Sequence, residues 1–124
     1  MNLLLDSHVV MWWVEASPRV KGAWLEPLLD SDNTVYVSAA TAWEIEIKKR
    51  SGKLAFAPNI VDVATEYGWE LLSISGPDAV GAGSLDWDHR DPFDRMLVAQ
   101  SLAGGMVLVT DDAALKSAPG IRTL

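Results

Sequence analysis

Four acidic side chains in this sequence stand where predicted strands end or predicted helices begin. They are Asp6, Glu44, Asp94 and Asp112. Mg²⁺ prefers oxygen ligands, keeps several of its waters, and is usually held in proteins by one or two carboxylates together with a substrate phosphate. If the fold brings these four carboxylates together, the chemistry they support is metal-assisted hydrolysis of a phosphate ester.

Two of these acids also have structural interpretations. Asp6 stands at the start of a predicted helix and could cap it, but Ser7 could do the same, which favours a functional role for Asp6. Glu44 could form a surface ion pair with Lys48, four residues later on the same helix. That helix follows a strand directly, so its first turns are expected over the same edge of the sheet as Asp6.

The other acids lie in two short segments that carry helix-start signals. Asp91 precedes Pro92 and is predicted to cap a helix, which places Asp94 in a first turn where the helix dipole favours an anion. Asp111 and Asp112 follow a predicted buried strand, and two adjacent like charges there favour a compensating cation. One of the two could cap the next helix while the other binds, so the choice between them stays open.

Hydrophobic patterning and turn residues predict strands that alternate with helices. The predicted strands cover 2–5, 34–38, 70–73, 106–110 and, at an edge, 121–124; the predicted helices cover about 9–14, 21–30, 40–50, 59–67, 75–83, 92–103 and a short segment after 112. This alternation predicts one α/β domain over residues 1–124, with a parallel sheet covered by helices on both faces. If strands 2–5 and 106–110 are neighbours, the acids that follow them meet at one rim.

The composition of the chain bears on which ligands it can hold and where it acts. The 124 residues are 49% hydrophobic and carry a formal net charge of −7, which is unfavourable for holding nucleic acid by phosphate contacts alone. Cysteine is absent, and His8 and His89 lack the spacing of zinc ligands, which argues against thiolate and zinc sites. The pattern indicates neither a signal peptide nor a membrane helix, so we expect a cytoplasmic protein.

The tryptophans favour packing over recognition of bases. Trp12, Trp13 and Trp43 lie in predicted amphipathic helices, where core or interface positions are the usual role. In the helix over 40–50, Ala40, Trp43 and Ile47 fall on one stripe, which is predicted to be buried.

Four segments carry a resemblance to a known family: Leu3-Leu4-Leu5-Asp6-Ser7-His8, Ser38-Ala39-Ala40-Thr41-Ala42-Trp43-Glu44-Ile45, His89-Arg90-Asp91-Pro92-Phe93-Asp94-Arg95 and Leu108-Val109-Thr110-Asp111-Asp112. The third, continued by Met96-Leu97-Val98-Ala99-Gln100, is the most specific. Nearly end to end, the chain resembles PIN-domain proteins, and specifically the VapC toxins of bacterial toxin–antitoxin pairs.

The resemblance implies a three-layer α/β/α sandwich and an endoribonuclease that uses Mg²⁺ or Mn²⁺. It maps the family's acids onto Asp6, Glu44, Asp94 and Asp112, of which the fourth is the one that varies in the family. It also implies a homodimer and a VapB antitoxin whose C-terminal segment blocks the site, often with an arginine. A net negative toxin suits such a partner, because an anionic pocket attracts a basic tail as well as a metal ion.

On this hypothesis, water attacks an RNA phosphodiester in line, and Asp6 and Asp94 are the principal metal ligands. The other two acids complete the outer shell or a second metal site. Ser7 and Thr110 are predicted to orient a ligand carboxylate or a water molecule. The predicted phosphate contacts are Arg90, Arg95 and the basic cluster from Lys48 to Lys53, which also holds Lys49 and Arg50.

Two other functions stay open from the sequence alone. In a catalytically silent binding module, the acids would serve only as helix caps and for solubility. A receiver-like phosphoacceptor domain shares the parallel sheet, but it needs a pair of acids after the first strand and a lysine directly after a late one. Asp6 stands alone after its strand, and no lysine directly follows the strand over 106–110, so this fit is poor.

Overall fold

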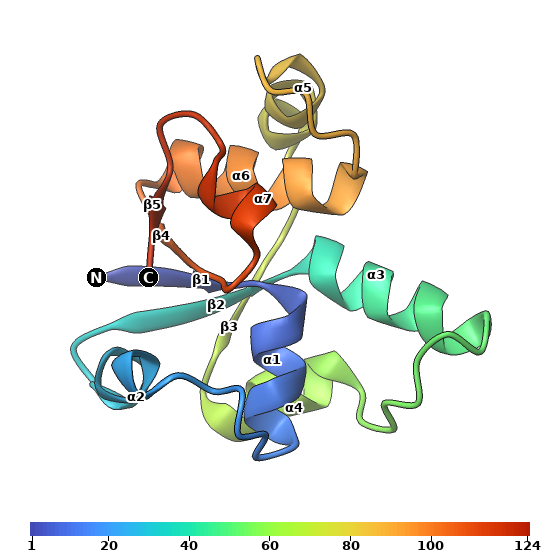
Figure 1. The fold of residues 1–124 in the computed structure, drawn as a ribbon, viewed down its shortest axis with the longest axis vertical. Helices are drawn as coiled ribbons and strands as arrows, with labels where there is room; N and C mark the ends of the chain where they lie inside the picture. The colour runs from blue at the N-terminus through green and yellow to red at the C-terminus, as the bar shows by residue number, and fades with distance from the viewer.

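A computed structural model describes residues 1–124 and contains one five-stranded parallel sheet between two layers of helices (Figure 1). The strands are β1 (Asn2–Leu5), β2 (Thr34–Ser38), β3 (Glu70–Leu72), β4 (Val107–Val109) and β5 (Arg122–Thr123). Their order across the sheet is β3-β2-β1-β4-β5, and every neighbouring pair is parallel. β1 is therefore central and β4 lies beside it.

Seven helices connect the strands: α1 (Ser7–Val14), α2 (Gly22–Leu29), α3 (Ala39–Arg50), α4 (Ile60–Tyr67), α5 (Gly76–Ser84), α6 (Pro92–Gly104) and α7 (Ala113–Lys116). In Figure 1, α1, α2 and α4 lie below the sheet, α5, α6 and α7 lie above it, and α3 runs outward from the end of β2. The predicted α/β/α sandwich is confirmed. None of these helices has the length and apolar character that crossing a bilayer requires.

Side-chain alternation along β1 creates a separate core on each face of the sheet. Leu3 and Leu5 belong to the larger core, which is covered by α1 to α4. Leu4 points the other way, into a core that contains Leu97 of α6 and Leu108 of β4. All three β1 leucines are 0% exposed, as expected for the central strand of a parallel sheet. Burial of each contributes about 2 kcal/mol to folding, which fixes the strand from which Asp6 extends.

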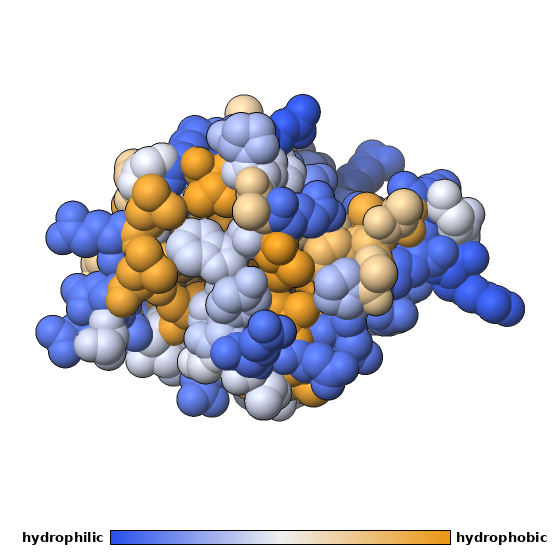
Figure 2. All heavy atoms as spheres, turned by 90° about the horizontal axis from the view of Figure 1, so that it is seen from below, coloured by the Kyte–Doolittle hydropathy of each residue, from blue (hydrophilic) through white to orange (hydrophobic).

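The helical layer below the sheet leaves apolar side chains at the surface. Figure 2 looks onto this layer from below and shows hydrophobic groups interspersed with polar ones. Leu25 and Leu29 of α2 and Val61 of α4 are exposed. Trp12 and Trp13 of α1 are half-buried against the larger core, in line with the packing role predicted for them.

α3 presents a different face to the core from the one predicted. Trp43 is 62% exposed and Ile47 is 44% exposed, so the predicted buried stripe is wrong for both residues. The buried residues of this helix are Ala40, Thr41, Glu44 and Ile45. The reason is that α3 turns Glu44 inward, toward the carboxyl edge of the sheet, and this rotation carries the neighbouring Trp43 outward.

Candidate active site

The site is built around Asp6, which directly follows the central strand. Its backbone N–H donates to the Val109 carbonyl of β4 at 3.0 Å, which places it beside Thr110. Asp6 is 3% exposed; Thr110 Oγ1 donates to its Oδ2 at 2.8 Å and Ser7 Oγ donates to its Oδ1 at 3.3 Å. Hydroxyl groups thus orient both carboxylate oxygens of Asp6. One belongs to Thr110, which follows β4, and the other to Ser7, the first residue of α1.

The helix-capping interpretation of Asp6 and Ser7 is wrong. Asp6 occupies the N-cap position of α1, but its side chain accepts no hydrogen bond from the helix backbone. Ser7 is already the first helical residue, and its hydroxyl binds Asp6 instead. The Asp6 carboxylate accepts hydrogen bonds from Thr110 and Ser7 instead, so α1 lacks a side-chain cap that would contribute about 1 kcal/mol.

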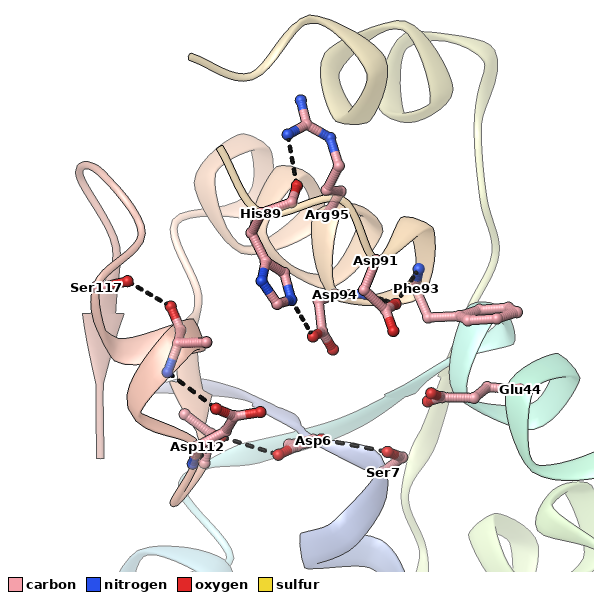
Figure 3. A network of polar contacts seen from close by, with 12 residues as sticks. Asp6, Ser7, Glu44, His89, Asp91, Phe93, Asp94, Arg95, Asp112 and Ser117 are labelled. Atoms are coloured by element: carbon pink, nitrogen blue, oxygen red, sulfur yellow. Dashed lines mark hydrogen bonds and ion pairs between the residues drawn. The ribbon is translucent and has the colours of Figure 1, made fainter. Parts of the chain in front are cut away.

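Asp94 reaches the site from the first turn of α6. Asp91 caps this helix, since its Oδ1 accepts from the backbone N–H groups of Phe93 at 2.9 Å and Asp94 at 3.1 Å, as predicted. Pro92 occupies the start of the helix. The cap fixes the first turn, and Figure 3 shows the Asp94 carboxylate directed across the sheet edge toward Asp6.

Burial shifts the acidity of Asp94. The side chain is 17% exposed, and His89 Nε2 lies 2.6 Å from its Oδ2. Burial raises the pKa of Asp94 to about 6, the hydrogen bond from His89 opposes this rise, and the negative charges of Asp91 and Asp6 add to it. At neutral pH the site therefore concentrates negative charge that a divalent cation would neutralise.

Glu44 approaches from the side of β2 and α3. Ser38, the last residue of β2, caps α3 by accepting from the Ala40 N–H at 3.0 Å, and Glu44 lies in the second turn. Its side chain is buried, and Lys48 Nζ lies 3.0 Å from its Oε2, so the predicted alternative of an ion pair does form. Figure 3 shows that Glu44, Asp6 and Asp94 nevertheless face a common space.

The adjacent acids after β4 have different surroundings. Asp111 is exposed, forms an ion pair with Lys21, and lies 3.7 Å from Lys116. The hydrogen bond from Lys21 lowers the pKa of Asp111. Asp112 caps α7 by accepting from the Ala114 N–H at 2.9 Å, and it lies on the Asp6 side of the site in Figure 3. Asp112 is therefore the cap of α7, whereas Asp111 is paired with surface lysines.

The predicted phosphate contact of Arg95 is wrong. Its guanidinium donates to the backbone carbonyls of Ala82, Gly83, Leu85, Trp87 and His89, at distances from 2.7 to 3.4 Å. With its donors directed at these carbonyls, Arg95 holds the loop between α5 and α6 rather than a ligand. Of the other predicted contacts, Lys48 is paired with Glu44 and Lys49 with Glu46, whereas Arg90 is exposed and forms no ion pair.

Two supporting residues escaped sequence reasoning. His89 contacts Asp94 and its ring stacks on Trp87, with ring centroids 4.7 Å apart. Gln100 of α6 is 2% exposed; its Oε1 accepts from Ser38 Oγ at 2.6 Å, which ties α6 to the start of α3. The only available signal was that both residues lie in or beside the segment of strongest resemblance.

The arrangement fits a magnesium-type site rather than a closed metal cage. No three of the acids and histidines lie close enough to enclose a metal ion by themselves. Mg²⁺ does not need such a cage, because it retains waters and uses one or two carboxylates with substrate phosphate. Asp6, whose two oxygens are oriented by hydroxyl groups, and Asp94, whose ionised form is disfavoured by burial and by the charges of Asp91 and Asp6, have the donor chemistry that this ion requires.

Comparison with known proteins identifies the family of the chain. The model of the PIN domain matches residues 3–121. The chain belongs to the PIN-domain family. A curated relative of this PIN domain is Ribonuclease VapC22 of Mycobacterium tuberculosis, 24% identical over 119 residues that cover 94% of this chain and 91% of the relative.

Solved structures share the fold of this PIN domain. VapBC2 from Rickettsia felis, bound to a promoter DNA fragment, aligns with a TM-score of 0.74 at 18% identity and covers 100% of this chain and 98% of the other. DNA-bound VapBC from Salmonella typhimurium aligns with a TM-score of 0.74 at 20% identity, covering 100% and 97%. The PIN domain endonuclease Utp24 aligns with a TM-score of 0.59 at 16% identity, covering 99% and 83%.

The receiver-like alternative is wrong. The strand order of this PIN domain, β3-β2-β1-β4-β5, differs from the 2-1-3-4-5 order of receiver domains. Asp6 also has no second acid beside it after β1, because the next residue is Ser7.

Proposed function

We propose that this PIN domain is a metal-dependent endoribonuclease, of the toxin type, that hydrolyses RNA phosphodiesters with Mg²⁺ or Mn²⁺. The observation that carries the proposal is the convergence of Asp6, Glu44 and Asp94 on one space at the carboxyl edge of the sheet. The relative named as a ribonuclease, which aligns over 94% of this chain, supports RNA as the substrate.

Each residue has a defined task in this proposal. Asp6 and Asp94 would hold the divalent ion, and Glu44 and Asp112 would complete its outer shell. A bound ion of this kind lowers the pKa of a coordinated water and neutralises the charge that develops on the phosphoryl oxygens.

Supporting hydrogen bonds keep these ligands in place. Thr110 and Ser7 fix the two oxygens of Asp6, and His89 fixes one oxygen of Asp94, which leaves the other oxygen of Asp94 directed toward the site. Such supporting contacts usually change metal affinity or activity by about 10- to 100-fold when they are removed.

We also propose a VapB-type antitoxin as partner, homodimerisation, and a cytoplasmic location. The similar structures from Rickettsia felis and Salmonella typhimurium are VapBC complexes, which supports the partner. The net charge of −7 supports a basic inhibitory segment, because an anionic site attracts it electrostatically. The exposed leucines of α2, Leu25 and Leu29, offer apolar contact area for a protein partner.

Cleavage of labelled RNA by the purified protein in Mg²⁺ tests the enzymatic proposal. Asp6→Asn should reduce the rate by about 100-fold or more, because it removes a ligand charge while keeping the side-chain shape. Asp32→Asn is the matched control, since it removes the charge of an exposed acid in the turn before β2, at the opposite edge of the sheet. Near-normal cleavage by a folded Asp6→Asn protein would reject the assignment.

The partner proposal has its own test. The small protein encoded beside this chain should co-purify with it, and its addition should suppress RNA cleavage at equimolar concentration. Failure of that protein to bind or inhibit would remove the antitoxin proposal and leave the nuclease proposal standing. Sequencing the RNA ends produced without the partner would then identify the cleaved sites.

A further inference from the structure

A cavity of about 210 Å³ has Asp6 in its wall but neither Glu44 nor Asp94. It is lined by Asp6, His8, Trp12, Arg19, Asp111 and Asp112. The cavity thus joins two candidate metal ligands to residues of α1 and of the segment between α1 and α2. His8 Nδ1 lies 4.0 Å from Asp6 Oδ1, and neither Trp12 nor Arg19 contributes to holding the metal-binding acids.

Arg19 is the cation in this cavity that is free to meet an anion. It is exposed and forms no ion pair with any acidic residue. Lys21 and Lys116, by contrast, are paired with Asp111, and Lys48 is paired with Glu44. The guanidinium of Arg19 therefore keeps its N–H donors for a ligand.

The position of Arg19 is fixed by aromatic contacts. Its guanidinium carbon lies 5.6 Å from the centroid of the Trp12 ring. Trp12 is in turn stacked on Trp24, with centroids 6.4 Å apart and planes 13° from parallel, and Trp24 is 1% exposed. A cation held over a packed indole loses less conformational entropy on binding a ligand than a free surface arginine does.

The remaining wall of the cavity can contact a base. The His8 side chain is 54% exposed, and its ring lies 5.8 Å from the Trp12 ring at an angle of 43°. Histidine and tryptophan rings are common contacts for unstacked bases of single-stranded RNA, and arginine is the preferred partner of phosphate.

We propose that this cavity is a nucleotide subsite for the RNA strand, next to the scissile phosphate. Arg19 binds the phosphate of the neighbouring nucleotide, and His8 and Trp12 contact its base. The inference rests on the proposed nuclease function and adds the direction in which the strand leaves the metal-binding acids: over α1, toward the segment that carries Arg19. It also supplies the phosphate contact that Arg95 does not make.

Binding of RNA to an inactive protein tests the subsite without relying on cleavage. In the Asp94→Asn background, Arg19→Ala should weaken binding of a labelled single-stranded RNA about tenfold in fluorescence anisotropy. The slope of log Kd against log salt should fall by about 0.7, the value for one lost phosphate contact with a single strand. Arg122→Ala is the matched control, because Arg122 is also exposed and forms no ion pair but lies at the start of the edge strand β5, away from the carboxyl ends of the strands.

Kinetics of the cleaving protein provide the second measurement. With Asp94 intact, Arg19→Ala should raise KM for RNA about tenfold with kcat changed less than threefold, and Arg19→Lys should recover part of the loss. Equal RNA affinity, salt slope and KM for the Arg19→Ala and Arg122→Ala proteins would overturn the subsite. If the unaltered protein cuts RNA, that result leaves the nuclease proposal intact; absence of cleavage by the unaltered protein would instead reject the nuclease proposal itself.

Discussion

Asp94→Asn should stabilise the metal-free protein while it abolishes RNA cleavage. Burial raises the pKa of Asp94 to about 6 from an ordinary value of 3.8. The folded protein therefore disfavours the ionised carboxylate more than the unfolded chain does. An asparagine has no charge to bury, and its side-chain oxygen can still accept the hydrogen bond from His89.

The magnitude follows from the pKa. The interval between 3.8 and about 6 corresponds to about 3 kcal/mol at neutral pH, at 1.36 kcal/mol for each tenfold change in acidity. Because His89 loses its charged hydrogen-bond partner, part of this gain is offset, and we expect the variant to be more stable by about 2 kcal/mol. For a chain of this length, that is a rise in Tm of about 8 °C.

The pKa shift also predicts how the stability difference between Asp94→Asn and the unaltered protein changes with pH. A carboxyl group whose folded pKa lies above its unfolded pKa stabilises the fold fully below about pH 4, and this contribution is lost as the pH rises through about 6. The advantage of Asp94→Asn should therefore be present at pH 7 and disappear near pH 4.

Thermal and urea unfolding in EDTA at these two pH values measure this difference. Asp86→Asn is the matched control, because it removes the charge of an exposed acid just before the same helix and should change stability by less than about 0.5 kcal/mol. An Asp94→Asn protein that is less stable at pH 7, or equally stabilised at both pH values, would refute the electrostatic reasoning.

Three further predictions concern the supporting residues. Arg95→Leu should lower the free energy of unfolding by about 3 kcal/mol or more in urea titrations, because it leaves the loop carbonyls without donors, whereas Arg90→Leu, at an exposed neighbour, should change it by less than about 0.5 kcal/mol. Thr110→Val should weaken Mn²⁺ binding in calorimetry about tenfold or more, and Thr110→Ser should not, since only the valine lacks the donor to Asp6. Gln100→Leu should lower Tm by several degrees, because the Ser38 hydroxyl loses its buried partner; an unchanged Tm would show that this contact contributes nothing.

Structural features whose signal lies within one short segment could be predicted from the sequence. The cap at Asp91 and the helix that follows it were predicted because the chain carries a proline and an acid at the positions that helix starts favour. The meeting of Asp6 and Thr110 depended on β1 and β4 being neighbours, and the register that pairs Leu5 with Val109 brings this about.

Side chains whose roles depend on distant segments could not be predicted. The pattern of α3 favoured burying Trp43, but the helix buries Glu44 instead, because functional sites break the hydrophobic pattern of the elements that carry them. Arg95 has the charge expected of a phosphate contact, and only the path of the α5–α6 loop shows that its donors are used internally. The residue type alone cannot show whether an arginine binds a phosphate or backbone carbonyls of its own chain.

In the proposed active site, Asp6 and Asp94 hold one divalent ion at the carboxyl edge of the sheet. Diffraction from crystals grown with Mn²⁺, recorded for the anomalous signal of manganese, tests it most directly. We expect a manganese peak within about 2.5 Å of a carboxylate oxygen of Asp6 or Asp94 and within water-bridging reach of the other. A peak elsewhere in the protein, or none at millimolar Mn²⁺, would contradict it.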